Sequence, residues 1–322
     1  MGAPGIKRNR IPKVGISLLN WNGYADTARC LSSLRQSEFR PSMILVFDNG
    51  SRDGSAERLK AEFPEIQLIS GGENLGFSEG NNRAARILLD AGMDYVWILN
   101  NDTEVSPDCL GWLVRALEED PGLGAASAKI WFMDGRKSLC YAGATCHPWT
   151  FEVKWRGLRD PDAGAYDRPE DTEILTGCCM LVRADVLRQI GLFNRTFFAY
   201  GEDADWSLRA GKAGIRKRYE PRATLWHKMF GSSSRAGGGA APKSSPRAEY
   251  LAMRNFILRV RLHTPSWAAR RWVALGWFVL FRHLPRGLAL LLLPSRRAAG
   301  GASLKGMWDG LWIQSESDPG RL

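Results

Sequence analysis

The first half of the chain alternates short apolar runs with amphipathic segments, and no other feature constrains the fold as strongly. The apolar runs, which are rich in Val, Ile and Leu, predict strands at residues 14–19, 43–48, 67–70 and 95–99. The segments that follow them predict helices at residues 24–36, 55–63, 78–91 and 107–119. Strands that are apolar along their whole length are buried on both faces, so the pattern predicts an α/β fold in which helices flank a mostly parallel sheet.

The later sequence predicts two more strands, a helix and a division into four regions. The further elements are strands at 123–130 and 174–182 and a helix at about 204–212, with a long irregular stretch at 134–169. A length of 322 residues suits one large domain with an appendage. The four expected regions are a basic tail at 1–12, a catalytic domain at 13–230, a flexible Ser/Gly/Ala-rich loop at 231–246 and a helical extension at 247–322.

The extension contains the most apolar part of the chain, residues 267–293, which Arg282, His283, Pro285 and Arg286 interrupt. The apolar pieces on either side are too short to cross a bilayer. Their Trp content and basic flanks predict an interfacial helical hairpin that associates with an anionic membrane surface, and a helical cap on the catalytic domain is the alternative. The net charge of +10 also suits phosphate-bearing ligands, whereas basic flanks around an apolar tail do not favour nucleic acid.

The cysteines and the N-terminus indicate an intracellular protein. The six cysteines show neither CxxC spacing nor the density of a disulfide scaffold, which predicts free and mostly buried thiols. The first residues contain no apolar signal region. We therefore expect a cytoplasmic enzyme held peripherally at the inner face of the plasma membrane.

Polar motifs follow the first two predicted strands. Asn20-Trp21-Asn22 comes after the first, and Asp48-Asn49-Gly50-Ser51 comes after the second, where open α/β sheets bind their ligands. Asp48 could accept the N3–H of uracil or thymine, and the amides of Asn20 and Asn22 could hold a base or ribose. Asp53 is expected to cap the next helix. No GxGxxG follows the first strand, which argues against a dehydrogenase.

Three further motifs carry candidate chemistry. Asn74-Leu75-Gly76-Phe77 begins a stretch that runs through Asn81 and opens a helix, where free N–H groups can bind a pyrophosphate. Asn100-Asn101-Asp102 ends an apolar strand, and Asp102 is a candidate oxygen ligand for Mg²⁺ or Mn²⁺. Glu202, Asp203 and Asp205 form an acidic cluster that can raise the pKa of one member toward that of a general base. His227 could complete a metal site or contact a diphosphate.

Taken in order and at family-like spacing, these motifs resemble glycosyltransferase family 2, specifically its rhamnosyltransferase-like branch with the GT-A fold. The similarity runs from residue 14 to about 255 and includes Thr176-Gly177-Cys178 and Arg254-Asn255. The resemblance implies that Asp48 reads the base and that Asn100-Asn101-Asp102 stands at the DxD metal motif, with Asn100 in place of the first Asp. It implies that Asp203 is the general base, with Glu202 as the fallback, and that His227 matches the late family His.

The resemblance also divides the candidate site residues by role. Residues expected at the donor are Asn20, Asn22, Asp48, Asn49, Ser51, Asn74, Gly76, Phe77, Asn81, Asn100 and Asn101. Residues expected at the acceptor are Gly177, Asp205 and Trp206, and those expected at the metal are Asp102 and His227.

The expected reaction is an inverting single displacement in the synthesis of cell-surface polysaccharide. The implied donor is dTDP-L-rhamnose, with UDP-galactofuranose, UDP-glucose and GDP-mannose as alternatives, and the acceptor is a saccharide or a lipid-linked saccharide. Two other classes stay open at this stage. A nucleotidyltransferase would need a Gly/Arg/Lys-rich phosphate loop, which Asn20-Trp21-Asn22 does not provide, and a membrane-associated scaffold would not require the acids at Asp102, Glu202 and Asp203. The sequence leaves open whether the chain forms a homodimer.

Overall fold

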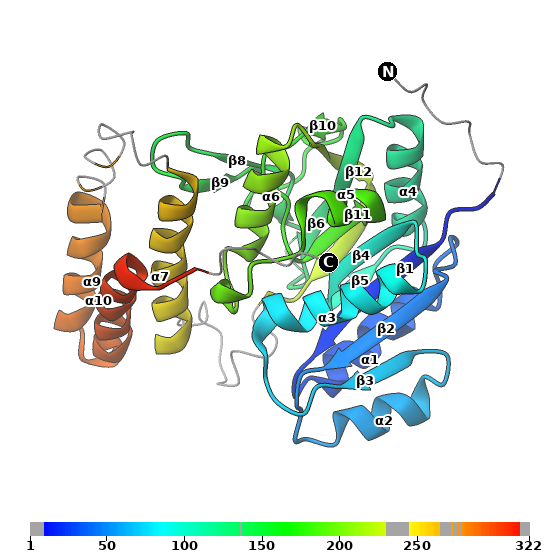
Figure 1. Ribbon diagram of the computed structural model, residues 1–322, viewed down its shortest axis with the longest axis horizontal. Helices are drawn as coiled ribbons and strands as arrows, with labels where there is room; N and C mark the ends of the chain where they lie inside the picture. Colours follow the sequence, from blue (N-terminus) through cyan, green and yellow to red (C-terminus); the bar gives the residue numbers. More distant parts are fainter. Residues whose placement is uncertain are drawn as a thin grey trace.

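A ten-stranded mixed sheet forms the centre of the molecule (Figure 1). The computed structural model describes residues 10–135, 137–229, 245–264, 272, 276 and 279–315. The principal strands lie in the order β10-β12-β6-β11-β4-β1-β2-β3, with β5 paired to β12 and β7 to β6. Their bounds are β1 Val14–Asn20, β2 Met43–Asp48, β3 Gln67–Ser70, β4 Tyr95–Asn100, β5 Thr103–Val105, β6 Leu123–Phe132, β7 Leu139–Tyr141, β10 Glu170–Asp171, β11 Cys179–Arg183 and β12 Arg216–His227. A separate hairpin consists of β8 Ala144–Cys146 and β9 Val153–Trp155.

The sheet is mostly parallel, as the sequence predicts. β1 pairs in parallel with both β2 and β4, β2 with β3, and β6 with β12. Only β11 among the long strands runs the other way, between β4 and β6. The carboxyl ends of β1, β2 and β4 therefore meet at one edge of the sheet.

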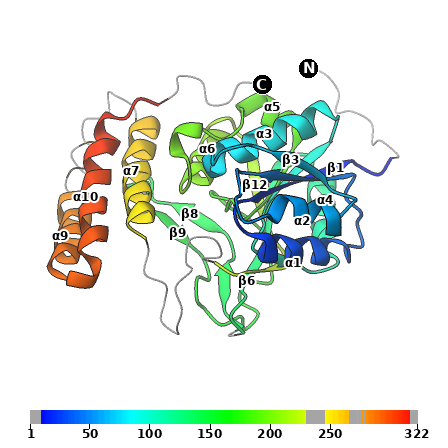
Figure 2. The same ribbon diagram turned by 90° about the horizontal axis from the view of Figure 1, so that it is seen from below.

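Helices cover both faces of the sheet (Figure 2). The core on one face joins Tyr95, Trp97 and Leu99 of β4 to α1 Tyr24–Leu34, α2 Ser55–Glu62 and α4 Cys109–Glu119. The core on the other face joins Val96 and Ile98 of the same strand to α3 Gly76–Asp90, α5 Ala184–Ile190 and α6 Glu202–Lys212. Successive side chains of β4 thus alternate between two cores, which explains why the strand is apolar throughout.

The C-terminal helices form a further layer beside α6 (Figures 1 and 2). They are α7 Pro246–His263, α9 Leu284–Leu292 and α10 Arg297–Trp312, with short helical turns η2 Val279–His283 and η3 Pro294–Arg296. Ser245 caps α7 by accepting a hydrogen bond from the N–H of Ala248, and Pro246 occupies its first turn. α10 packs closely on α7, because a Cβ at Gly306 would lie 2.4 Å from the carbonyl oxygen of Tyr250.

Two sequence predictions in the second half of the domain are wrong in detail. The strand predicted at 174–182 begins only at Cys179, since the preceding residues bend to line a cavity. The strands β5 and β12 were not predicted. β12 begins with Arg216-Lys217-Arg218. Its side chains alternate between solvent and core, and these charged residues obscure the apolar pattern from which a strand is predicted. The predicted irregular stretch at 134–169 contains β7, β8 and β9.

The described part of the C-terminal extension packs as a helical cap on the catalytic domain, which is the second of the two alternatives that the sequence offers. α7 packs through Met253, Phe256, Ile257 and Val260 against Phe151 of the catalytic domain, and α10 packs on α7. None of the described helices is both long and apolar enough to cross a membrane. Residues 1–9 of the expected tail, residues 231–244 of the expected loop and most of the apolar residues at 265–278 lie outside the described residues. All six cysteines are unpaired and five of them are buried, as predicted.

Candidate active site

A cavity of about 900 Å³ opens at the carboxyl ends of β1, β2 and β4. It continues past the first turn of α6 and along α7 to the β8–β9 hairpin. Asp102 and Asp203, which are 101 positions apart in the chain, both line it. The cavity therefore brings together the two acidic motifs on which the sequence-based mechanism depends.

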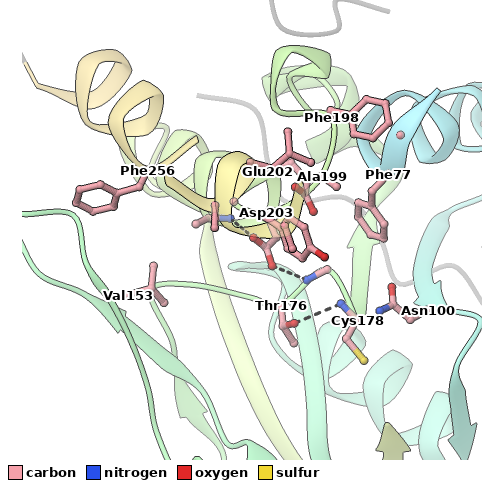
Figure 3. A pocket seen from close by; sticks show the side chains of 18 of the residues that line it. Phe77, Asn100, Val153, Thr176, Cys178, Phe198, Ala199, Glu202, Asp203 and Phe256 are labelled. Atoms are coloured by element: carbon pink, nitrogen blue, oxygen red, sulfur yellow. Dashed lines mark hydrogen bonds between the residues drawn. The ribbon is translucent and has the colours of Figure 1, made fainter. Parts of the chain in front are cut away.

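Asp203 lies in the first turn of α6 and is held by two backbone donors (Figure 3). Its Oδ2 accepts a hydrogen bond from the N–H of Gly177 at 2.9 Å, and its Oδ1 accepts one from its neighbour Ala204 at 2.7 Å. Residue 177 is a glycine at a tight point, because a Cβ there would lie 3.2 Å from the ring of Phe77. The carboxylate is thus fixed in position at the cavity wall.

Burial changes the protonation of the Glu202-Asp203 pair. It raises the pKa of Asp203, against the hydrogen bonds from Gly177 and Ala204 and the charge of Arg259, which lower it. Burial and the charge of Asp203 raise the pKa of Glu202 well above its usual value. Glu202 is 5% exposed, and its Oε2 has no hydrogen-bond partner among the described residues. Asp203, with two N–H donors, is therefore the favoured place for the negative charge of the pair.

The second charged group of the cavity is the pair formed by Asp102 and His227. Pairing of β5 with the end of β12 sets Thr103 opposite His227, and this brings the imidazole Nε2 to 3.0 Å from Oδ1 of Asp102. The amide nitrogen of Asn100 lies 3.4 Å from the same ring nitrogen. Burial lowers the pKa of His227, but the charge of Asp102 and its hydrogen bond to the ring outweigh burial and raise the pKa.

The Asp102–His227 pair fits a divalent cation only in part. Oxygen and imidazole ligands suit Mg²⁺ or Mn²⁺. The described residues contain no group of three or more His, Cys, Asp or Glu side chains that could hold a metal ion. A cation here would therefore draw its remaining ligands from the nearby Asn100 and Asn101 amides, from water and from a bound phosphate.

The predicted donor residues fall into two groups in the structure. Those on the cavity wall are Asn49, Asn74, Gly76, Phe77, Asn100 and Asn101. The amide of Asn49 organises this wall, since it donates to Oδ1 of Asn74 at 3.1 Å and accepts from the N–H of Leu75 at 2.9 Å. Those that do not line the cavity are Asn20, Asn22, Asp48, Ser51 and Asn81, of which Asn20, Asp48 and Asn81 are buried.

Two of the residues that do not line the cavity correct the donor prediction. Asn20 is fully buried and donates to Oδ1 of Asp48 at 2.7 Å, so it positions that carboxylate instead of facing a ligand. Asn81 is also buried and accepts a hydrogen bond from Ser17 at 2.9 Å. Base recognition by Asp48 stays a prediction. Gly54 is the N-cap residue of α2, and Asp53, which was expected to cap this helix, lies one position earlier and accepts hydrogen bonds from the backbone N–H and hydroxyl of Ser55.

Of the residues expected at the acceptor, Gly177 lines the cavity, whereas Asp205 and Trp206 do not. Trp206 is 1% exposed in the core between the sheet and its helices, and its indole N–H donates to the carbonyl of Gly191. Asp205 is buried and paired with Arg209 and His263. Successive residues of a helix point about 100° apart, so only part of the acidic run can face the cavity.

Sequence reasoning missed the contribution of α7 to the cavity. Ala252, Phe256 and Arg259 line it at the spacing of one helical face. An arginine on the same stripe as buried apolar residues is the signal that could have identified this wall. The hairpin residues Val153 and Trp155 also line the cavity, and the predicted irregular stretch gives no indication of their position.

Comparisons with known proteins agree with this geometry. The model of the Glycosyl transferase family 2 matches residues 18–191. An N-acetylglucosaminyl-diphospho-decaprenol L-rhamnosyltransferase of Mycobacterium tuberculosis is 31% identical, over 80% of this chain and 87% of its own length. The O-antigen biosynthesis protein RfbC of Myxococcus xanthus is 26% identical, over 76% of this chain and 19% of its own length.

Solved structures show the same fold at low sequence identity. GalNAc-T7 with UDP, GalNAc and Mn²⁺ superposes with a TM-score of 0.60 at 14% identity, covering 95% of this chain and 57% of that one. The mannosyltransferase PcManGT of Pyrobaculum calidifontis, with GDP-Man and Mn²⁺, gives a TM-score of 0.56 at 16% identity, covering 94% and 88%. With a family match over more than half of its length and the fold of these enzymes, the chain is a glycosyltransferase of family 2 with the GT-A fold.

Proposed function

We propose that this enzyme transfers L-rhamnose, with inversion, from dTDP-L-rhamnose to a saccharide or lipid-linked saccharide in cell-surface polysaccharide synthesis. The choice of sugar and acceptor is supported by the mycobacterial rhamnosyltransferase, whose name includes a sugar on a lipid diphosphate. The observation that carries the chemistry is the position of Asp203, a partly buried carboxylate held by two backbone N–H groups on the same cavity as Asp102 and His227.

Asp203 is the proposed general base. As the acceptor oxygen attacks the anomeric carbon, its proton passes to the Asp203 carboxylate, the new C–O bond forms and the bond to the diphosphate breaks on the opposite face. A diphosphate leaves as a stable anion, so no acid is needed to protonate it, in contrast to glycoside hydrolysis. A single displacement of this kind inverts the anomeric configuration.

Asp102 and His227 are proposed to receive the diphosphate end of the donor, with Mg²⁺ or Mn²⁺. The cation would neutralise charge that develops on the leaving phosphate. The chain itself contributes the imidazole of His227 beside Asp102, together with the amides of Asn100 and Asn101 on the cavity wall.

The α9–α10 layer is proposed to rest on an anionic membrane surface. Several large apolar side chains are exposed there, namely Phe281, Leu288, Leu292, Leu293, Trp308, Leu311 and Trp312. Arg296 and Arg297 are exposed at the turn between the two helices. Exposed Trp and Leu beside arginine suit the interface of a membrane with negatively charged lipids. Binding there would place the enzyme close to a lipid-linked acceptor.

The donor can be identified by incubating the enzyme and Mn²⁺ with dTDP-L-rhamnose, UDP-galactofuranose, UDP-glucose or GDP-mannose and measuring the released nucleoside diphosphate. The acceptor in this assay is N-acetylglucosaminyl diphosphate on a short alkyl chain. We expect release with dTDP-L-rhamnose and an inverted anomeric centre by NMR. Release from another donor alone would replace the sugar in this proposal, and a retained configuration would exclude Asp203 as the base of a single displacement.

Membrane binding can be measured separately by sedimentation with vesicles of phosphatidylglycerol or of phosphatidylcholine. We expect binding to the anionic vesicles alone, weakened by Trp308→Ser with Trp312→Ser and by high salt. Trp149→Ser removes an exposed Trp from the β8–β9 hairpin and is the matched control. Equal binding of all these proteins would contradict the assignment of this surface.

A further inference from the structure

Oε2 of Glu202 and Nε of Arg259 are buried polar atoms of residues that line the cavity, and neither has a hydrogen-bond partner among the described residues. Glu202 is 5% exposed and Arg259 is 8% exposed, so water does not freely solvate either group. Leaving a buried polar group unsatisfied costs about 1–3 kcal/mol, and more for a charged group, so such atoms at a binding cavity indicate a ligand that completes them.

Arg259 is held in place without being neutralised. Its Nη2 donates to the carbonyl of Phe151 at 3.0 Å, and its Nη1 would lie 3.1 Å from a Cβ placed on Gly201, the residue before Glu202. No described carboxylate lies within ion-pair distance of it, although the charges of Asp203, Asp205 and Glu202 all act on it. The guanidinium therefore stands against the start of α6, and its buried Nε–H has no partner among the described residues.

Glu202 and Arg259 line the same cavity as the base. In Figure 3, Asp203 lies between Phe77 and Asn100 on one side and Val153 and Phe256 on the other. Asn100 belongs to the end of the cavity assigned to the donor diphosphate. Arg259 is about one helical turn beyond Phe256 on α7, and Glu202 directly precedes Asp203 in the first turn of α6.

We propose that Glu202 and Arg259 bind one hydroxyl group of the acceptor saccharide. A hydroxyl both donates and accepts hydrogen bonds, so one group can donate to Oε2 of Glu202 while it accepts from Nε–H of Arg259. Val153, Trp155 and Phe256 give the same part of the cavity an apolar wall suited to the C–H face of a sugar ring. This inference rests on the proposed function, because it deepens the acceptor side of the same reaction.

The test uses the full-length enzyme, dTDP-L-rhamnose and N-acetylglucosaminyl diphosphate on a short alkyl chain, together with monodeoxy analogues of that acceptor. For Arg259→Met we expect the KM for the acceptor to rise about 10- to 100-fold, the effect of losing a hydrogen bond to a charged group. The KM for the donor should change less than twofold. One deoxy analogue should be a poor substrate for the wild type, and Arg259→Met should no longer distinguish it from the parent acceptor.

Two further variants keep this test decisive. Arg259→Lys retains the charge but lacks the Nε–H, so it should also lose discrimination against that one analogue, and it replaces Arg259→Met if the latter does not fold. Arg261→Met removes an arginine from the same helix that bonds to Gly310 and Ile313 outside the cavity, and its acceptor KM should equal that of the wild type.

The outcomes separate this inference from the proposed function. If the wild type transfers the sugar but the Arg259 variants keep the acceptor KM and the discrimination against every analogue, the hydroxyl site is wrong and the function stands. A rise in the donor KM alone would place Arg259 at the donor and would also overturn the inference. Failure of the wild type to transfer to any saccharide would instead remove the proposed function.

Discussion

The carboxylate of Asp205 lies 2.8 Å from Nε2 of His263, and this buried contact joins the helix that carries the proposed base to the helix that forms the far wall of the cavity. Asp205 also pairs with Arg209 at 3.0 Å. Burial opposes ionisation of Asp205, but the hydrogen bond and charge of His263, together with Arg209, hold its pKa below the usual value. This acid, which sequence reasoning placed in the acceptor pocket, fastens α7 to α6.

Removing this contact should destabilise the protein in a pH-dependent manner. We expect Asp205→Asn to lower the free energy of unfolding by about 3–5 kcal/mol, because it leaves buried partners uncompensated. A lowered folded-state pKa contributes stability above the unfolded-state pKa and loses it as the pH falls through the folded-state value. The deficit should therefore persist from neutral pH down to about pH 4 and should shrink below that pH in urea unfolding. Asp185→Asn, an exposed acid in the first turn of α5, should leave stability unchanged.

Replacing the proposed base should abolish turnover without loss of donor binding. We expect Asp203→Asn to lower kcat by about 10²–10⁴-fold, the usual contribution of a general base. The dissociation constant of dTDP-L-rhamnose, measured by calorimetry with Mn²⁺, should change less than threefold. Asp185→Asn again serves as a control. Near-normal turnover in Asp203→Asn would move the base to another residue, with Glu202 as the first candidate.

Metal dependence should follow Asp102 and His227. Chelation with EDTA is expected to remove wild-type activity, and Mn²⁺ should restore it. Asp102→Asn and His227→Ala should each shift the Mn²⁺ concentration for half-maximal activity upward by about 10-fold or more, by analogy with the loss of a supporting ligand. His147→Ala, which removes an exposed His from the β8–β9 hairpin, should behave as the wild type. Full wild-type activity in EDTA would contradict a metal at this pair.

The buried Glu202 should make the wild type less stable as the pH rises. Its pKa is raised on folding, by burial and then by the charge of Asp203, so the folded state holds the proton more tightly than the unfolded state. A group of this kind contributes its full stability below the unfolded-state pKa and loses it as the pH rises through the folded-state value. Glu202→Gln should therefore gain stability over the wild type above about pH 4.5, by up to about 1.4 kcal/mol per pH unit before the difference levels off.

That difference can be measured by urea unfolding between pH 4 and pH 8. Glu57→Gln, an exposed acid in the first turn of α2, provides the matched control and should show no such trend. A constant difference between Glu202→Gln and the wild type over this range would mean that Glu202 ionises as freely in the folded chain as in the unfolded one.

The sequence predicts the first half of the fold well because burial leaves a clear pattern there. β1, β2 and β4 have two covered faces, so nearly every residue is apolar and the runs stand out. β12 lies toward the other end of the sheet and begins with three basic residues, so its pattern is weak although it carries His227 into the cavity. A strand that is buried on both faces is therefore much easier to predict from local sequence than a strand that is buried on one face.

The candidate site was predictable where it is made of motifs at strand ends, and not where it is made by packing. Asn49, Asn100 and Asp102 follow strands whose ends meet, so their convergence follows from parallel pairing. Arg259 reaches the cavity only because α7 docks on the domain through Phe256 and its neighbours, a long-range contact that no local pattern encodes. Trp206 was assigned wrongly because a helix turns alternate members of one motif toward the core.

Two faces of α7 make contacts that matter for the site. Ala252 and Phe256 line the cavity, whereas Tyr250 and Arg254 pack closely against glycines of α10. Because α7 packs on both the catalytic domain and α10, it cannot tilt toward one of them without moving away from the other. A displacement of α9 or α10 would therefore move α7 as well, and with it the part of the cavity that receives the acceptor.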